Sequence, residues 1–135
     1  MAKRGRKPKG DDEDLPWMKF WIGDWLRSPI SSCSPEAQVL WIRMMIIAHH
    51  GQPYGTLRIK GIQLTPAYIA NRCGVLLRKY DELMAEIDSV DVPKRDEEGC
   101  LIWPQMQRDH AELLLYRKNK RDQRAKEAAR KAAGQ

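Results

Sequence analysis

The sequence predicts a mainly α-helical domain that contains one small β-hairpin and is followed by a basic helix. Three observations support this fold class. Apolar residues recur at helical spacing in the middle of the chain, turns rich in Gly and Pro separate these runs, and two short apolar segments flank a polar stretch at residues 93–99. With 135 residues, 42% of them hydrophobic, the chain has room for one compact domain with polar extensions.

The formal net charge of +6 is concentrated at the two ends of the chain. Residues 1–10 contain five Lys or Arg, four acids follow at 11–14, and residues 117–135 contain eight Lys or Arg against two acids. We therefore predict a basic and acidic arm over 1–14 that is disordered when free, a nearly neutral domain over 15–116, and a basic helical tail over 117–135. A segment with many cations favours binding to a polyanion such as a nucleic acid, because each phosphate that it neutralises releases counterions. Solvated tails that only aid solubility are the alternative.

Several classes of protein are not expected. Cys33, Cys73 and Cys100 are odd in number and lack CxxC spacing, which favours buried free thiols over disulfides or a zinc site. No stretch approaches the roughly 20 apolar residues of a membrane span, so we expect a cytoplasmic protein without a membrane partner. The sequence contains no nucleophile paired with a base and no glycine-rich phosphate loop, and the adjacent His49 and His50 point in different directions on a helix. We expect no enzymatic activity, cofactor or metal.

The first ordered segment is the most aromatic part of the chain. Trp17, Trp21 and Trp25 recur at a spacing of four and predict one helical stripe. A stacking platform for single-stranded bases is conceivable. Packing in the core is favoured, because a domain of this size needs its large aromatic side chains inside.

The next segment begins with helix-start residues. Ser34 is a suitable N-cap, Pro35 suits the first helical position, and Glu36 favours the positive end of the helix dipole. Apolar residues follow at helical spacing up to Gly51, which predicts a mostly buried helix: Val39, Leu40, Ile42, Met45 and Ile46.

The second half of the predicted domain contains two short helices joined by a glycine turn. Residues 55–59 predict a short strand with Lys60-Gly61 as its turn, and Thr65-Pro66 then opens a helix that Gly74 ends. A further helix presents four apolar residues at i, i+3, i+4 and i+7, namely Tyr80, Leu83, Met84 and Ile87. Residues 90–92 and 100–103 then form the two sides of a β-hairpin. Helix, strand, helix, turn, helix and hairpin is the order of a winged helix-turn-helix.

The chain becomes helical again from Pro104. Met106, His110, Leu113 and Leu114 are placed to pack on the core, whereas no large apolar residue follows Tyr116. The last turns must therefore project into solvent or lie on a partner.

These motifs together resemble a family of phage and prophage winged-helix proteins, akin to the N-terminal domains of replisome organisers and DnaD-like primosome proteins. The resemblance covers about residues 16–120 and is carried by Phe20-Trp21-Ile22-Gly23-Asp24-Trp25-Leu26, Ser34-Pro35-Glu36-Ala37, Leu40-Trp41-Ile42, Pro53-Tyr54-Gly55-Thr56-Leu57, Cys73-Gly74-Val75, Asp96-Glu97-Glu98-Gly99 and Met106-Gln107-Arg108-Asp109. It implies a role in phage DNA replication in a bacterial host, with a replicative helicase or its loader as partner and often a homo-oligomeric state. This chain has Leu76-Leu77 where relatives tend to have a polar cap before the third helix.

The candidate DNA-binding residues fall into four groups. A winged helix places its third helix in the major groove, which points to Arg72, Arg78 and Lys79, although acids share that helix and a balanced solvated face is equally compatible. The hairpin offers Lys94 and Arg95, the N-terminal arm offers Arg4, Gly5, Arg6 and Lys7, and the basic tail offers Arg117, Lys118, Lys120, Arg121 and Arg124. The arm resembles an AT-hook, whose arginines enter a narrow A·T-rich minor groove, or it is a generic basic tail.

Three functional hypotheses follow from this distribution of residues. The first is a protein that binds double-stranded A·T-rich or single-stranded DNA during the initiation of phage or prophage replication. The second is a phage transcriptional regulator with the same fold. The third is a winged-helix interaction module that targets host machinery, which the neutral domain would suit.

Overall fold

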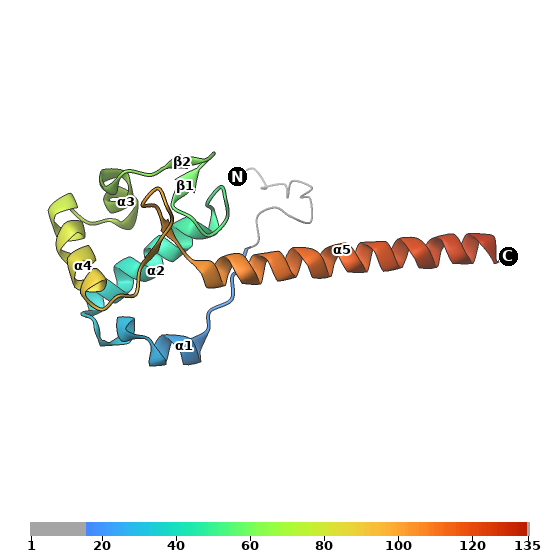
Figure 1. Cartoon of the computed structure of the whole chain (residues 1–135), viewed down its shortest axis with the longest axis horizontal. Helices are drawn as coiled ribbons and strands as arrows, with labels where there is room; N and C mark the ends of the chain where they lie inside the picture. The colour runs from blue at the N-terminus through green and yellow to red at the C-terminus, as the bar shows by residue number, and fades with distance from the viewer. Residues whose placement is uncertain (1–15, 135) are drawn as a thin grey trace, which may run out of the picture.

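The computed structural model describes residues 16–134, so the predicted arm at 1–14 lies outside the described residues. The chain is mainly helical with small antiparallel β-sheets, as predicted. In chain order the elements are α1 (Ile22–Arg27), η1 (Pro29–Ser32), α2 (Pro35–His49), β1 (Arg58–Ile59), β2 (Ile62–Gln63), α3 (Pro66–Cys73), α4 (Leu77–Ser89), β3 (Lys94–Arg95), β4 (Leu101–Ile102) and α5 (Pro104–Ala133). Figure 1 shows these elements gathered at one end of a long projecting α5.

The core lies where α2, α3 and α4 pack on one another and on the start of α5. Leu40 and Met44 of α2, Ile69 of α3 and Ile87 of α4 are all at most 4% exposed. Trp103, just before α5, packs against Trp41 with ring centroids 5.0 Å apart. All three cysteines are buried free thiols, as the sequence predicts.

The start of α2 forms as predicted, but its buried face differs from the prediction. The Ser34 hydroxyl accepts a hydrogen bond from the Ala37 N–H, and Pro35 occupies the first helical position. Val39, Ile42 and Ile46, predicted to be buried, are 36–51% exposed. The buried face consists of Ala37, Leu40, Trp41, Met44 and Ala48.

The two helices joined by a glycine turn are confirmed. The Thr65 hydroxyl accepts a hydrogen bond from the Tyr68 N–H at the start of α3, and Gly74 ends that helix in the left-handed conformation with φ 76°. The buried residues of α4 are the four that its periodicity predicts, Tyr80, Leu83, Met84 and Ile87. The N-cap of α4 is Leu76, whose side chain accepts no capping hydrogen bond.

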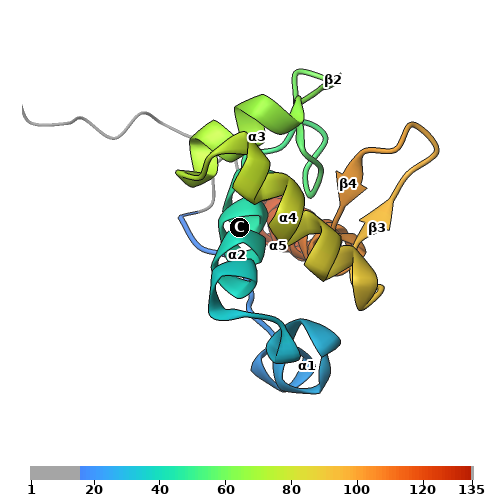
Figure 2. The same ribbon diagram turned by 90° about the vertical axis from the view of Figure 1, so that its left-hand side faces the viewer.

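Two hairpins complete the domain. β1 pairs with β2 through a turn at Lys60 and Gly61, both with positive φ, and β3 pairs with β4 in the register Lys94 with Ile102 and Arg95 with Leu101. The first strand of the second hairpin lies two residues beyond the predicted segment at 90–92. A bridge between Thr56 and Ile102 joins the segment before β1 to β4. In Figure 2 this second hairpin lies to one side of α4.

The aromatic segment before α2 differs most from its prediction. Its helix covers only residues 22–27, and the predicted stripe of core tryptophans does not form. Trp17 is 49% exposed, Trp21 48% and Phe20 43%, whereas Trp25 is partly buried against the core. The prediction of core packing is therefore wrong for Trp17 and Trp21.

Helix α5 begins on the core and continues without a break through the predicted tail. Met106 is buried in the core, as the sequence predicts, whereas His110, Leu113 and Leu114 are only partly buried. Residues 118–134 are all exposed. At 1.5 Å per residue the projecting part is about 25 Å long.

Candidate nucleic-acid interface

The predicted major-groove surface on α3 and α4 carries few available cations. Arg72 and Arg78 are exposed, and within residues 16–134 neither forms an ion pair. The Lys79 ammonium instead lies 3.2 Å from a Glu36 carboxylate oxygen and 3.9 Å from one of Glu82. Lys79 therefore links α4 to the start of α2.

The exposed face of α4 is acidic overall. This helix has three exposed acids, Asp81, Glu82 and Asp88, and one exposed cation, Arg78. Glu86 is turned toward α2, where its carboxylate accepts hydrogen bonds from the Ser34 N–H and hydroxyl. These hydrogen bonds lower the pKa of Glu86 and keep it ionised. A phosphate backbone lying along α4 would meet more negative than positive charge.

The β3–β4 hairpin holds its own charges in local pairs. Arg95 forms two hydrogen bonds to Asp88 at the end of α4, 3.0 and 3.3 Å long. Arg58, which is 8% exposed, lies 2.7 Å from Asp96 and 3.5 Å from Glu98. The two acids of this hairpin thus neutralise Arg58, a residue that the sequence analysis missed. Lys94 is exposed and has no ion pair among the residues that the structure describes.

The groups of predicted site residues are not brought together. Arg78 lies at the first turn of α4, whereas Arg95 pairs with Asp88 at the other end of this helix. Arg78 and Asp88 are about ten residues apart, which corresponds to roughly 15 Å along the helix axis. The candidates of the N-terminal arm, Arg4 to Lys7, lie outside the described residues. The five candidates of the tail all lie on α5.

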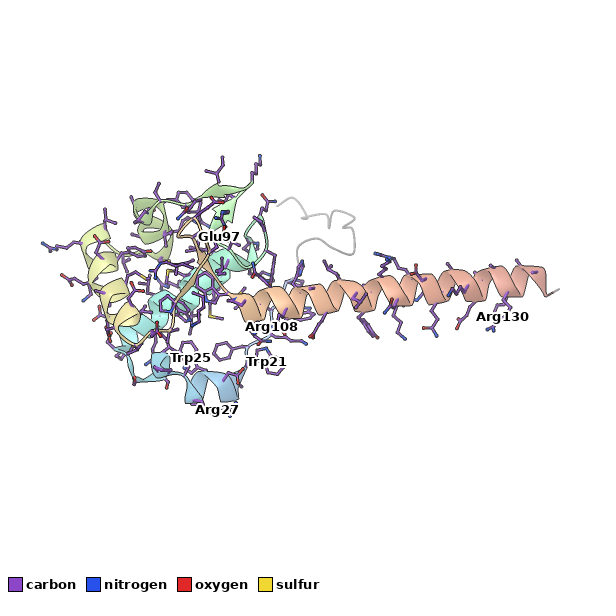
Figure 3. The ribbon with its side chains drawn as sticks, viewed as in Figure 1. Trp21, Trp25, Arg27, Glu97, Arg108 and Arg130 are labelled. Carbon is purple, nitrogen blue, oxygen red and sulfur yellow. The ribbon has the colours of Figure 1, made fainter. Side chains whose placement is uncertain are left out.

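The cations of α5 form a continuous row on the projecting part of the helix. Arg117, Lys120, Arg121 and Arg124 recur at i, i+3, i+4 and i+7, which places them on one face, and Lys118 lies about 100° around the axis. The same periodicity connects this row to Met106, which is buried in the core, and to His110 and Leu113, which are partly buried. The helix face that is apolar on the domain therefore becomes cationic where the domain ends. In Figure 3 Arg130 marks the far end of this charged region.

An aromatic surface lies at the base of α5. The Trp21 indole N–H donates a hydrogen bond of 2.8 Å to Asp109 of α5, which holds the segment before α1 against this helix. Figure 3 shows Trp21 and Trp25 between α1 and the first turns of α5. The Lys120 ammonium lies 5.7 Å from the centroid of the Tyr116 ring. The sequence suggested the tryptophans as a stacking platform and marked Tyr116 only as the last large apolar residue before the basic run, without assigning it to this surface.

Among the described residues, no group of three or more His, Cys, Asp or Glu is arranged to hold a metal ion. In the same part of the chain, no helix is both long enough and apolar enough to cross a bilayer. Comparison with protein-family models, with curated proteins and with solved structures finds no match for this chain, so membership of the family that it resembles stays a prediction.

Proposed function

We propose that this chain is a DNA-binding protein in which α5 carries most of the affinity. The observation that supports this most strongly is the basic end of α5, where eight Lys or Arg stand against two acids over residues 117–134 and residues 118–134 are exposed. A helical row of cations can follow a phosphate backbone, because each contact between a cation and a phosphate releases counterions.

We further propose that the domain is a winged helix. The order α2, β1, α3, α4, β3, β4 and the glycine turn at Gly74 fit this fold. An isolated bridge from Thr56 to Ile102, with the Leu57 N–H donating to the Leu101 carbonyl, places the segment before β1 beside β4 of the hairpin. In this proposal the domain positions α5 and does not read bases through α4, since the exposed face of α4 is acidic.

A role in the initiation of phage or prophage replication is supported by the resemblance described above. Binding dominated by phosphate contacts fits such a role better than it fits a transcriptional regulator, which needs base-specific contacts in the major groove. A replicative helicase or its loader is the corresponding protein partner, in the cytoplasm of a bacterial host.

An interaction module is the second candidate function, and two observations favour it. The exposed face of α4 is acidic, and α2 exposes an apolar stripe of Val39, Ile42 and Ile46. A helix that is apolar on both faces is typically covered on both faces.

The test is fluorescence-anisotropy binding to A·T-rich and G·C-rich duplexes across a salt series. We compare the full chain with a variant in which Arg117, Lys120, Arg121 and Arg124 are all changed to Gln, which keeps the helix and removes four charges. If all four contact phosphates, the slope of log K against log salt falls by about 3 to 4. The matched control changes Arg72 and Arg78 to Gln, and there we expect little loss.

If the four-charge variant binds duplex DNA as tightly as the full chain, α5 does not carry the affinity. If neither protein binds DNA, the interaction module is the better description. A further variant with Arg4 and Arg6 changed to Gln tests the AT-hook prediction, because loss of a true hook removes the preference for the A·T-rich duplex.

A further inference from the structure

Four aromatic side chains are at least 43% exposed around the base of α5. They are Trp17, Phe20 and Trp21, which precede α1, and Tyr116 of α5, which is 60% exposed. Exposed aromatic rings that gather at one place typically mark a binding surface, because burying them would otherwise stabilise the fold. The DNA-binding role of α5 proposed above does not use these rings.

Two of the rings line one pocket. A cavity of about 280 Å³ lies between the segment before α1 and α5, and its walls include Trp17, Met18, Lys19, Tyr54, Leu113 and Tyr116. Pockets for drug-sized ligands start at about 300 Å³, so this one suits a group of the size of a single heterocyclic base. Trp17 and Tyr116 are far apart in sequence, and only the fold brings them to the same pocket.

One wall of the pocket, Tyr116, lies beside a cation of the α5 row. Tyr116, Lys120 and Arg124 recur at i, i+4 and i+8 and so share one face of the helix, with Glu127 and Lys131 close to that face further out. The Lys120 ammonium lies 5.7 Å from the centroid of the Tyr116 ring, which places a cation beside an aromatic wall of the pocket. A chain of phosphates that follows these cations would begin beside an exposed aromatic ring.

The acids of the pocket decide which part of a nucleotide can enter. Asp109 and Glu112 also line this cavity and repel phosphate. Asp109 already accepts hydrogen bonds from the Trp21 indole N–H and the Gln105 amide. A base is uncharged, and its N–H groups can donate hydrogen bonds to carboxylates, so a base is compatible with this lining. A phosphate is instead compatible with Lys120 and Arg124, which lie outside the pocket.

We propose that this pocket and the α5 row together bind single-stranded DNA. One base stacks on Trp17 or Tyr116, and the backbone follows Lys120, Arg124 and Lys131 outward along the helix. A single strand is required, because the bases of a duplex are stacked on each other and cannot enter a pocket. This inference rests on the proposed function, since the same helix supplies the phosphate contacts in both.

The experiment measures binding of the full chain to a labelled oligo(dT) strand of about 16 nucleotides and to a labelled duplex. Trp17→Ala and Tyr116→Ala each weaken binding of the single strand by about tenfold, which lies within the range measured for loss of one stacked base, and leave duplex binding unchanged. Tyr116→Phe keeps the ring and binds the single strand like the unmodified chain. The matched control is Leu115→Ala, which removes a neighbouring side chain that is 59% exposed and points about 100° away on the helix.

The failure of this inference is distinguishable from the failure of the proposed function. If the four-charge variant of α5 loses binding while Trp17→Ala and Tyr116→Ala bind oligo(dT) normally, the stacking site is wrong and the DNA-binding role stands. The same conclusion follows if both aromatic variants weaken single-strand and duplex binding equally. If the full chain binds neither probe, both proposals are wrong. Thermal unfolding of each variant confirms that it is folded.

Discussion

Asp96 is one of the residues that link the second hairpin to the rest of the domain. Its carboxylate pairs with the nearly buried Arg58 and accepts hydrogen bonds from the backbone N–H groups of Glu98 and Cys100. The hydrogen bond from Arg58, together with the two backbone bonds, lowers the pKa of Asp96 below its ordinary value of 3.8. Because the folded pKa is lower than the unfolded one, the stabilisation is present at neutral pH. It is lost as the pH falls below about 4 and through the folded pKa.

We predict that Asp96→Asn lowers the melting temperature at neutral pH and flattens the loss of stability between neutral and acidic pH. The variant leaves Arg58 buried without its closest partner, which is costly for a buried charge. Melting temperature measured by circular dichroism over a pH series checks this. Glu97→Gln is the matched control, because Glu97 is exposed in the same hairpin and forms no ion pair among residues 16–134. An unchanged pH profile in Asp96→Asn would contradict the prediction.

At the scale of elements, helix α2 provides a test of which apolar residues stabilise the fold. Leu40 is 2% exposed, whereas Ile46 on the same helix is 51% exposed. We predict that Leu40→Ala lowers the free energy of unfolding by about 2–5 kcal/mol, because it leaves a cavity in the core. Ile46→Ala should change it by about 0.5 kcal/mol or less. Urea denaturation of both variants measures the difference between their free energies of unfolding. Equal losses in the two variants would show that Ile46 is buried in solution, for example in an assembly.

A comparison of α4 with α2 shows which buried faces the sequence could predict and which it could not. The periodicity of α4 identified its buried face, because polar residues occupy the other positions and leave one choice. In α2, apolar residues occupy both faces, so periodicity alone could not select Leu40 and Met44 over Val39 and Ile46. Caps and breaks were predictable from local chemistry, as at Ser34 and Thr65, because the groups that interact are three residues apart.

The candidate site was predictable only in part for a related reason. The basic run of α5 is visible in the sequence, because charge density is a local property. The pairing of Lys79 with Glu36 and of Arg58 with Asp96 depends on contacts between distant segments. The meeting of Trp17 with Tyr116 at one pocket depends on the path of the chain before α1, where the aromatic spacing suggested a core helix instead.

At the scale of the whole molecule, we predict that the projecting part of α5 contributes little to the stability of the domain. Residues 118–134 are exposed. Deletion of residues 118–135 should therefore lower the helical signal in circular dichroism and leave the melting temperature nearly unchanged. The same deletion should remove most of the affinity for DNA. A large fall in melting temperature would show that the projecting helix packs on the domain in solution.

The separation of a nearly neutral domain from a strongly positive helix makes the described part of the molecule a large electric dipole. Its positive end reaches about 25 Å beyond the domain, more than twice the Debye length of roughly 10 Å at moderate salt. In the field of a polyanion the molecule therefore experiences a torque as well as an attraction, and it arrives with the tip of α5 leading. Orientation before contact raises the fraction of productive encounters. Added salt would then slow association more than it speeds dissociation.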